Sequence, residues 1–446
     1  MAEGSVSIKC QLVEGDVLRQ VAVGARKVGL VYSMLLVLVL GVGCTGSAPA
    51  VQLTVTPAAT RMDEPAALRV SHLKPGSLVD LVLRSVDARG TTWTSQASFV
   101  ADATGTVDPT LAPPTDAYLQ AWGMGLFSVM SPSPAEDGYR WPTTGAATFD
   151  VDVEQGGRSV ASGSLERTMW TQPPTTRTFT VAADGFVGTY VKPAGVQRGP
   201  AVLVLGGSEG GDPSFDATIL AARGIPALSV AYFEAPGLPS QLQNIPLEYF
   251  DTPLRWLRAQ PEVDPDRIWI SGASRGSEAA GLIAAARPDL VHGLLDLSPS
   301  SAANCAYVPS THQPCPGAAW LRNGRPVPYT KQYGTSVPTD HPSAAIAFEK
   351  VNGPVLTLCG GADLLWNSCK YSDAIQQRLQ QHHTRFPRLA LHYPDAGHAV
   401  DLPMPYEPLA PPAPGADPTY GSTPTANEQA RADAWPKILS FVRHPA

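Results

Sequence analysis

The sequence predicts an α/β domain preceded by an all-β domain, because its hydrophobic pattern changes near residue 185. Before that point, apolar and polar residues alternate in short segments separated by turns, as in Val51–Val55 and Val79–Arg84. After it, short β-branched runs alternate with helical segments, which is typical of a parallel sheet covered by helices on both faces. The length of 446 residues accommodates two or three domains.

Residues 1–47 are predicted to be an export segment. Arg26 and Lys27 precede the apolar run Val28–Gly43, which is shorter than the about 20 residues of a membrane span and is followed by Cys44. Leu40-Gly-Val-Gly-Cys44 resembles a lipoprotein cleavage site, and a lipid on Cys44 would attach the protein to a membrane. We expect an exported protein, either membrane-attached or secreted. The alternatives are an uncleaved anchor helix and, without a functional signal, a cytoplasmic protein.

The net charge bears on nucleic-acid binding, and the cysteine content bears on disulfides and metal sites. A net charge of −7 offers no basic surface, so we expect no nucleic-acid partner. Beyond the export segment, Cys305, Cys315, Cys359 and Cys369 fall into two local pairs. They are interpreted either as two short-loop disulfides or as free buried thiols. Their spacing is not that of a zinc site, and no metal or cofactor is expected.

Residues 48–181 are predicted to form an immunoglobulin-like antiparallel sandwich that serves as a packing module. Residues 185–446 are predicted to form the α/β domain. Its expected strands are 188–192, 201–205, 226–232, 267–271, 293–297, 355–359 and 389–393. Its expected helices are 215–223, 246–259, 277–286, 371–382 and 426–441.

Gly272-Ala-Ser274-Arg-Gly276 follows the apolar strand Ile268–Ser271 and precedes a helix rich in small residues. This pattern predicts a nucleophile elbow, a tight turn that presents the hydroxyl of Ser274 to a base. The alternative is an ordinary glycine turn without a catalytic role. The strand before the turn and the helix after it favour the elbow. The order of elements around it fits an α/β-hydrolase sheet.

An activated serine needs a base and an acid, which follow it in the order Ser, Asp, His in this fold. The strand Val355–Cys359 leads through two glycines to Asp363, the predicted acid. The strand 389–393 leads to His398, the predicted base. We therefore expect a catalytic triad of Ser274, His398 and Asp363.

A tetrahedral intermediate also needs two backbone N–H groups directed at its oxyanion. The residue after the nucleophile, Arg275, is the first predicted donor. The second is expected in the loop 205–211, with Ser208 preferred over Gly207 and Glu209. A phosphate-binding loop is the alternative, but the segment lacks the lysine and the spacing of that motif.

Five ordered motifs resemble the acyl-CoA thioesterase and bile acid-CoA:amino acid N-acyltransferase (BAAT) family. They are Ala231-Tyr-Phe233, Asn244–Phe250, the elbow, Gly361–Ser368 and Tyr393–His398. The segments Leu53–Pro57, Asp63–Pro65 and Gly123–Leu126 are similar to the sandwich domain of that family. The resemblance implies the same three catalytic residues: Ser274, Asp363 and His398.

The resemblance also implies a serine-dependent acyl-CoA thioester hydrolase, since acyl-transferring members resemble a version with a cysteine nucleophile. Coenzyme A is scarce outside the cytoplasm, so an exported esterase or amidase with another acyl substrate is the first alternative. A second alternative is an enzyme that transfers the acyl group to an amino acid. A third is a non-catalytic surface lipoprotein that binds lipid. Trp366 and Tyr232 are candidates for an acyl pocket, although core packing is the commoner role of such residues.

Overall fold

The computed structural model describes residues 49–136, 138–142, 144–308, 315–331, 341–401, 404–408 and 421–445. The predicted export segment 1–47, with Cys44, lies outside the described residues. From Pro49 onward the chain forms one compact unit. None of the helices in the described part is both long and apolar enough to cross a membrane.

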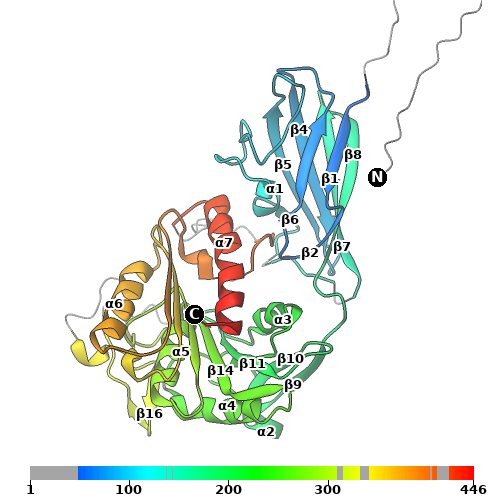
Figure 1. Cartoon of the computed structure of the whole chain (residues 1–446). Helices are drawn as coiled ribbons and strands as arrows, with labels where there is room; N and C mark the ends of the chain where they lie inside the picture. The colour runs from blue at the N-terminus through cyan, green and yellow to red at the C-terminus, as the bar shows by residue number, and fades with distance from the viewer. Residues whose placement is uncertain are drawn as a thin grey trace, which may run out of the picture. The chain divides into compact units, whose positions relative to one another are not determined.

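The N-terminal part is rich in β-strands, as the alternating pattern predicts (Figure 1). A six-stranded sheet has the order β2-β8-β7-β4-β5-β6, and β1 pairs with β3 in a separate two-stranded sheet. Side chains along β4 and β7 alternate between buried and more exposed, so one face of the larger sheet packs into the core. The strands are β1 (Gln52–Thr56), β2 (Ala59–Arg61), β3 (Ala67–Ser71), β4 (Leu78–Val86), β5 (Thr92–Val100), β6 (Ser131–Ser133), β7 (Ala146–Gln155) and β8 (Arg158–Thr168).

The C-terminal part is built on an eight-stranded sheet with the order β19-β18-β15-β14-β11-β12-β10-β9. Its strands are parallel except at one edge, where β10 pairs antiparallel with both β12 and β9. This is the arrangement of an α/β-hydrolase sheet, as predicted. The strands are β9 (Thr175–Phe179), β10 (Val187–Lys192), β11 (Gly199–Leu205), β12 (Ala227–Ala231), β14 (Val263–Ala273), β15 (Gly293–Leu297), β18 (Val355–Gly360) and β19 (Arg388–Tyr393).

The edge strand β9 lies within residues 48–181, the range predicted for the sandwich, yet it pairs with the α/β sheet. Its side chains are mostly exposed, so its sequence carries no buried apolar run that would mark it as part of this sheet. A small three-stranded sheet, β13-β16-β17, was also not predicted. Its strands are β13 (Ile245–Pro246), β16 (Trp320–Arg322) and β17 (Arg325–Pro326).

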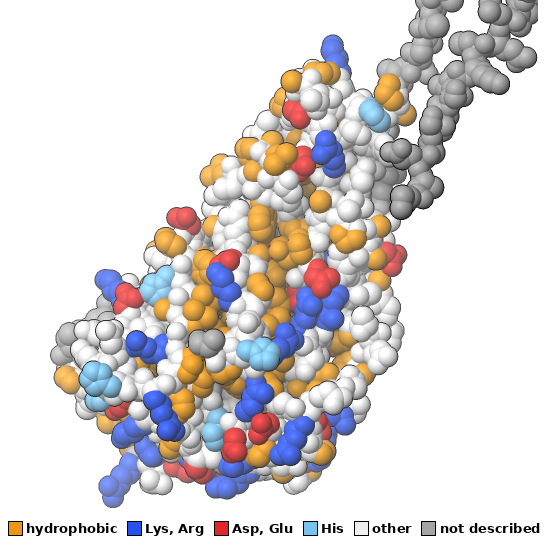
Figure 2. Space-filling model, viewed as in Figure 1, with side chains coloured by type: hydrophobic (Ala, Val, Ile, Leu, Met, Phe, Trp, Pro, Cys, Tyr) orange, Lys and Arg blue, Asp and Glu red, His pale blue; other side chains and the backbone are white. Residues whose placement is uncertain are grey.

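The helices lie close to their predicted positions, and α5 follows directly on the central strand β14. Figure 2 shows hydrophobic side chains gathered on the face that carries α7, where Pro65, Tyr406, Trp435 and Leu439 line a groove. The α-helices are α1 (Gly125–Ser128), α2 (Val181–Asp184), α3 (Ser214–Ala222), α4 (Asp251–Arg258), α5 (Arg275–Ala286), α6 (Ser368–Gln381) and α7 (Pro424–Arg443). Single 3-10 turns are η1 (Leu247–Phe250), η3 (Pro342–Ala344), η4 (Phe348–Lys350) and η5 (His398–Asp401).

Candidate active site

Ser274 forms the turn between β14 and α5. Its backbone has φ 54° and ψ −120°, a conformation that residues with a side chain rarely adopt. The N–H of Ser274 donates to the carbonyl of Leu297 at the end of β15, 3.0 Å away. Neighbouring elements thus hold the serine in the strained turn that the sequence predicts at the carboxyl edge of the sheet.

The two glycines of the elbow are required by close packing. A Cβ at Gly272 would collide with the carbonyl oxygen of Gly276, four residues further along. A Cβ at Gly276 would collide with the carbonyl oxygens of Leu205 and Gly206. The elbow therefore lies directly against the glycine-rich loop that follows β11.

His398 joins Ser274 and Asp363 through hydrogen bonds. Its Nε2 lies 3.0 Å from Ser274 Oγ, and its Nδ1 lies 2.8 Å from Asp363 Oδ2. The side chains of His398 and Asp363 are only 5% and 1% exposed. An ionised carboxylate only accepts hydrogen bonds, so Nδ1 carries the proton and Nε2 accepts from the serine hydroxyl. The structure thus brings together the three residues predicted from sequence.

Backbone and side-chain contacts fix the acid and the base in place. The other carboxylate oxygen of Asp363, Oδ1, accepts from the N–H groups of Leu365 and Trp366, at 2.9 and 3.2 Å. On the histidine loop, Ser298 Oγ donates to the carbonyl of His398, 3.0 Å away. Asn427 Oδ1 of α7 accepts from the N–H of Gly397, 2.7 Å away. Both loops are therefore anchored before any substrate is bound.

Charges around His398 set its protonation behaviour. Burial by itself lowers the pKa of the imidazole, but the carboxylates of Asp401, Asp363 and Glu209 favour the charged ring. The combined effect of these carboxylates outweighs that of burial, so the pKa of His398 lies above its ordinary value.

The two aromatic residues that we considered for an acyl pocket are both buried. Trp366 packs edge-on against the imidazole of His398, with ring centroids 5.8 Å apart, and donates through Nε1 to the carbonyl of Ser298. The hydroxyl of Tyr232 donates to the carbonyl of Gly206, 2.7 Å away. Tyr232 thus braces the glycine loop, while Trp366 borders the histidine.

The loop 205–211 lies beside the serine. A Cβ at Gly207 would come within 3.1 Å of the Cβ of Ser274. The N–H of Gly207 donates to the carboxylate of Glu209, 2.6 Å away, and Ser208 between them is half-buried. The loop predicted to supply an oxyanion donor therefore lies against Ser274, and one of its N–H groups is bonded to a carboxylate.

Arg275, predicted as the first oxyanion donor, begins α5. Its guanidinium is fully buried, donates to the carbonyl of Cys305 and pairs with Glu278, with Nε and Oε2 2.9 Å apart. Glu278 also accepts from Asn304 and Trp320. The side chain therefore anchors the helix, and the backbone N–H remains at the helix N-terminus next to Ser274.

Two acidic side chains whose charges act on His398 were not predicted as part of the site. Asp401 lies three residues after the histidine, and its Oδ2 is 3.6 Å from Nε2. Glu209 was considered only for its backbone N–H. The three-residue spacing within His398–Asp401 was the available signal, but it is informative only if the segment is helical, which the sequence did not indicate.

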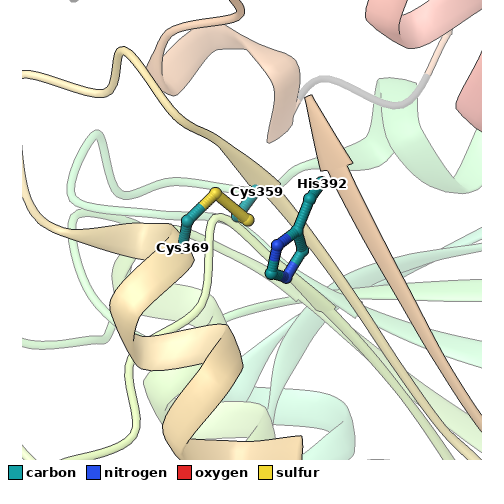
Figure 3. Close-up of side chains that lie close together, drawn as sticks. All are labelled: Cys359, Cys369 and His392. Carbon is teal, nitrogen blue, oxygen red and sulfur yellow. A yellow bond between two sulfur atoms is a disulfide. The ribbon is translucent and has the colours of Figure 1, made fainter. Parts of the chain in front are cut away.

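One of the two possible cysteine pairs is a disulfide. Cys359 at the end of β18 is bonded to Cys369 in α6, and Asp363 lies in the loop that they close. Figure 3 shows His392 of β19 beside this bond.

Among the described residues, Cys359, Cys369 and His392 form the one group close enough to bind a metal ion, but the two cysteine sulfurs are bonded to each other. Cys305 and Cys315 are free thiols, and burial raises the pKa of Cys305 to about 12.

Comparison with known proteins identifies relatives for most of the chain. Residues 63–181 match the acyl-CoA thioester hydrolase/BAAT N-terminal region. Residues 245–445 match the BAAT/acyl-CoA thioester hydrolase C-terminal region.

Curated relatives align over nearly their whole length. Acyl-coenzyme A thioesterase 1 of Rattus norvegicus is 29% identical over 398 residues, covering 85% of this chain and 93% of the relative. Acyl-coenzyme A amino acid N-acyltransferase 1 of Mus musculus is 25% identical over 421 residues, covering 88% and 97%. Among solved structures, an esterase of Pyrobaculum calidifontis has a TM-score of 0.40 at 17% identity and covers 61% of this chain and 86% of its own. The two matched regions, in their proper order, show that the chain belongs to the acyl-CoA thioester hydrolase/BAAT family.

Proposed function

We propose that this protein is a serine hydrolase that cleaves acyl thioesters through an acyl-enzyme intermediate. The observation that carries the proposal is the hydrogen-bonded series from Ser274 through His398 to Asp363, in a buried site at the carboxyl edge of the sheet. The names of the relatives point to acyl-CoA as the substrate class.

In the proposed reaction, the hydroxyl oxygen of Ser274 attacks the acyl carbonyl while its proton moves to Nε2 of His398. Asp363 holds the imidazole in the tautomer that can accept this proton. Protonated His398 then donates to the leaving thiolate, which departs as the free thiol. Water, deprotonated by the same histidine, then attacks the acyl-serine ester. The ester C–O bond breaks, His398 returns the proton to Ser274 Oγ, and the acid is released.

The developing oxyanion is expected to bind the backbone N–H of Arg275 and a second N–H from the loop 205–211. We propose Ser208 as the second donor, because the N–H of Gly207 is bonded to Glu209. The N-terminal part, for which we propose an immunoglobulin-like sandwich, would act as a packing module for the catalytic part.

Ser274→Ala is the direct test. The variant should hydrolyse long-chain acyl-CoA and p-nitrophenyl esters at background rate, because loss of a triad nucleophile typically costs on the order of a millionfold in kcat. Ser440→Ala, on the exposed side of α7, is the matched control and should retain full activity. A fluorophosphonate probe should label Ser274 in the unmodified protein, as read by peptide mass spectrometry. Retained turnover in Ser274→Ala would refute the assignment.

Acyl transfer to an amine is a second candidate, favoured by the similarity to an N-acyltransferase. Supplying glycine or taurine with acyl-CoA separates the two outcomes. Free acid as the product supports hydrolysis, whereas an N-acyl amino acid identified by mass spectrometry supports transfer.

A further inference from the structure

His398 lies between two carboxylates, of which the proposed reaction uses one. Asp363 contacts Nδ1 at 2.8 Å, and Asp401 lies 3.6 Å from Nε2. Nε2 is also the atom that faces Ser274 Oγ, at 3.0 Å. Asp401 is therefore close to the nitrogen that would receive the serine proton.

The position of Asp401 follows from local structure. His398–Asp401 forms the 3-10 turn η5, and side chains three residues apart lie on the same side of such a turn. Asp401 faces a small cavity together with Asp216 of α3. The other cavity walls are mainly apolar: Val204, Leu205, Leu220, Ala273, Leu295, Leu297, Trp435 and Ile438. The carboxylate thus reaches the histidine from a poorly solvated side.

The charged groups around this pair lie in two helices, α3 and α7, and in the loops that carry Glu209 and Asp363. Burial raises the pKa of Asp401 to about 6, against the opposing effects of His398 and of Arg431 in α7, with Glu209 and Asp363 raising it further. Burial, Glu209 and Asp401 raise the pKa of Asp216 to about 7. His398 and Arg431 thus favour the ionised form of Asp401, whereas the charges that act on Asp216 are both negative and favour its protonated form.

We infer that Asp401 is a positioning residue whose carboxylate stabilises the imidazolium formed when Ser274 Oγ transfers its proton to His398 Nε2. In that step the serine O–H bond breaks and an Nε2–H bond forms, so the ring gains one positive charge. A negative charge 3.6 Å away, in surroundings that screen it weakly, favours the charged ring. This inference rests on the proposed function, because it assigns His398 as the base.

The test separates the charge of Asp401 from its bulk. Asp401→Asn keeps the size of the side chain and removes the charge. Asp216→Asn makes the same change on the neighbouring cavity wall, and Asp216 makes no hydrogen bond or ion pair with His398 among the described contacts. If Asp401→Asn fails to fold, Asp401→Ser takes its place as the neutral variant. Folding is checked by circular dichroism and thermal unfolding.

The rate at which a fluorophosphonate labels Ser274 is measured against pH, since it depends on neutral His398 and requires no knowledge of the natural substrate. The rate should rise as His398 loses its proton. In Asp401→Asn the midpoint should move to lower pH, because removing a negative charge makes the imidazolium easier to deprotonate. The rate on the high-pH plateau should fall on the order of tenfold. Asp216→Asn should keep the midpoint and the plateau close to those of the unmodified protein.

A folded Asp401→Asn protein with an unchanged midpoint would refute the inference, whatever its plateau rate, because a purely structural role leaves the midpoint in place. A faster plateau rate would also refute it, since it would show that Asp401 competes with Ser274 for Nε2. Failure of the proposed function looks different: Ser274 of the unmodified protein would then remain unlabelled at every pH.

Discussion

At the scale of single residues, the elbow depends on how closely two backbone segments approach. Gly276 lies against the carbonyl oxygens of Leu205 and Gly206, so the loop that carries Ser208 packs directly on the turn that carries Ser274. The turn of Ser274 and the loop 205–211, to which the proposed function assigns the nucleophile and an oxyanion donor, therefore share one close contact. Any side chain at residue 276 would have to push them apart.

Gly276→Ala should consequently impair both stability and catalysis. The added Cβ meets backbone atoms, which cannot rotate away, so we expect a loss of about 1–3 kcal/mol in the free energy of unfolding. Displacing the oxyanion loop should lower kcat by about a hundredfold. Gly199→Ala is the control, because the nearest atom to a Cβ there lies 3.8 Å away. Urea unfolding and acyl-CoA hydrolysis measure the two effects, and a fully active Gly276→Ala protein would contradict this account of the elbow.

The sequence was sufficient to place Ser274, Asp363 and His398. Ser274 and Asp363 follow strands with recognisable buried apolar residues, β14 and β18, and His398 follows the more exposed edge strand β19. Parallel strands bring their carboxyl ends to one edge of the sheet, so order along the chain predicted proximity in space. Asp401 and Glu209 were not predicted as side chains of the site. Their positions depend on a single 3-10 turn and on the path of a glycine loop, neither of which leaves a periodic pattern.

At the scale of elements, the strand β18 and the helix α6 are joined covalently around the acid. Because the Cys359–Cys369 disulfide closes the loop that contains Asp363, it restricts that loop in the unfolded chain as well as in the folded one. Cysteine spacing predicted this pair, but it could not distinguish it from Cys305 and Cys315, whose thiols are free.

Cys369→Ser should therefore lower the free energy of unfolding by about 2–4 kcal/mol, the usual effect of opening a short disulfide loop. We also expect kcat to fall more than KM rises, because a looser Asp363 orients His398 less well while leaving substrate contacts intact. Cys315→Ser, which removes a free thiol, is the control for the loss of one sulfur. Equal unfolding free energies of the two variants under non-reducing conditions would rule out a stabilising role for the bond.

At the scale of the whole molecule, Arg167 connects segments that are far apart in the sequence. It lies in β8, is fully buried, and donates to the carbonyls of Met62 and Tyr406. Its guanidinium also lies 5.2 Å from the ring centroid of Phe127 and 5.4 Å from that of Trp141. A second connection is made by Asp63, which pairs with Arg223, the residue directly after α3, and accepts from Trp435 of α7. The β-rich part and the α/β part are thus linked by polar contacts shielded from water.

Burial is costly for Arg167 itself and lowers its pKa to about 10, while Glu428 and Asp63 act in the opposite direction. Such a group is retained only where its hydrogen bonds and neighbouring charges compensate for lost hydration. If the guanidinium were removed, the carbonyls of Met62 and Tyr406 would lose the hydrogen bonds that Arg167 donates.

Arg167→Met should therefore reduce the free energy of unfolding by about 3–5 kcal/mol, although methionine fills much of the same volume. Arg158→Met is the matched control, since Arg158 begins the same strand with an exposed side chain. Denaturant unfolding, followed by tryptophan fluorescence, measures both. Because Arg167 joins the β-rich part to the segment containing Tyr406, its loss should also broaden the transition as the two parts begin to unfold separately. A single sharp transition at the midpoint of the unmodified protein would show that Arg167 is dispensable for holding the two parts together.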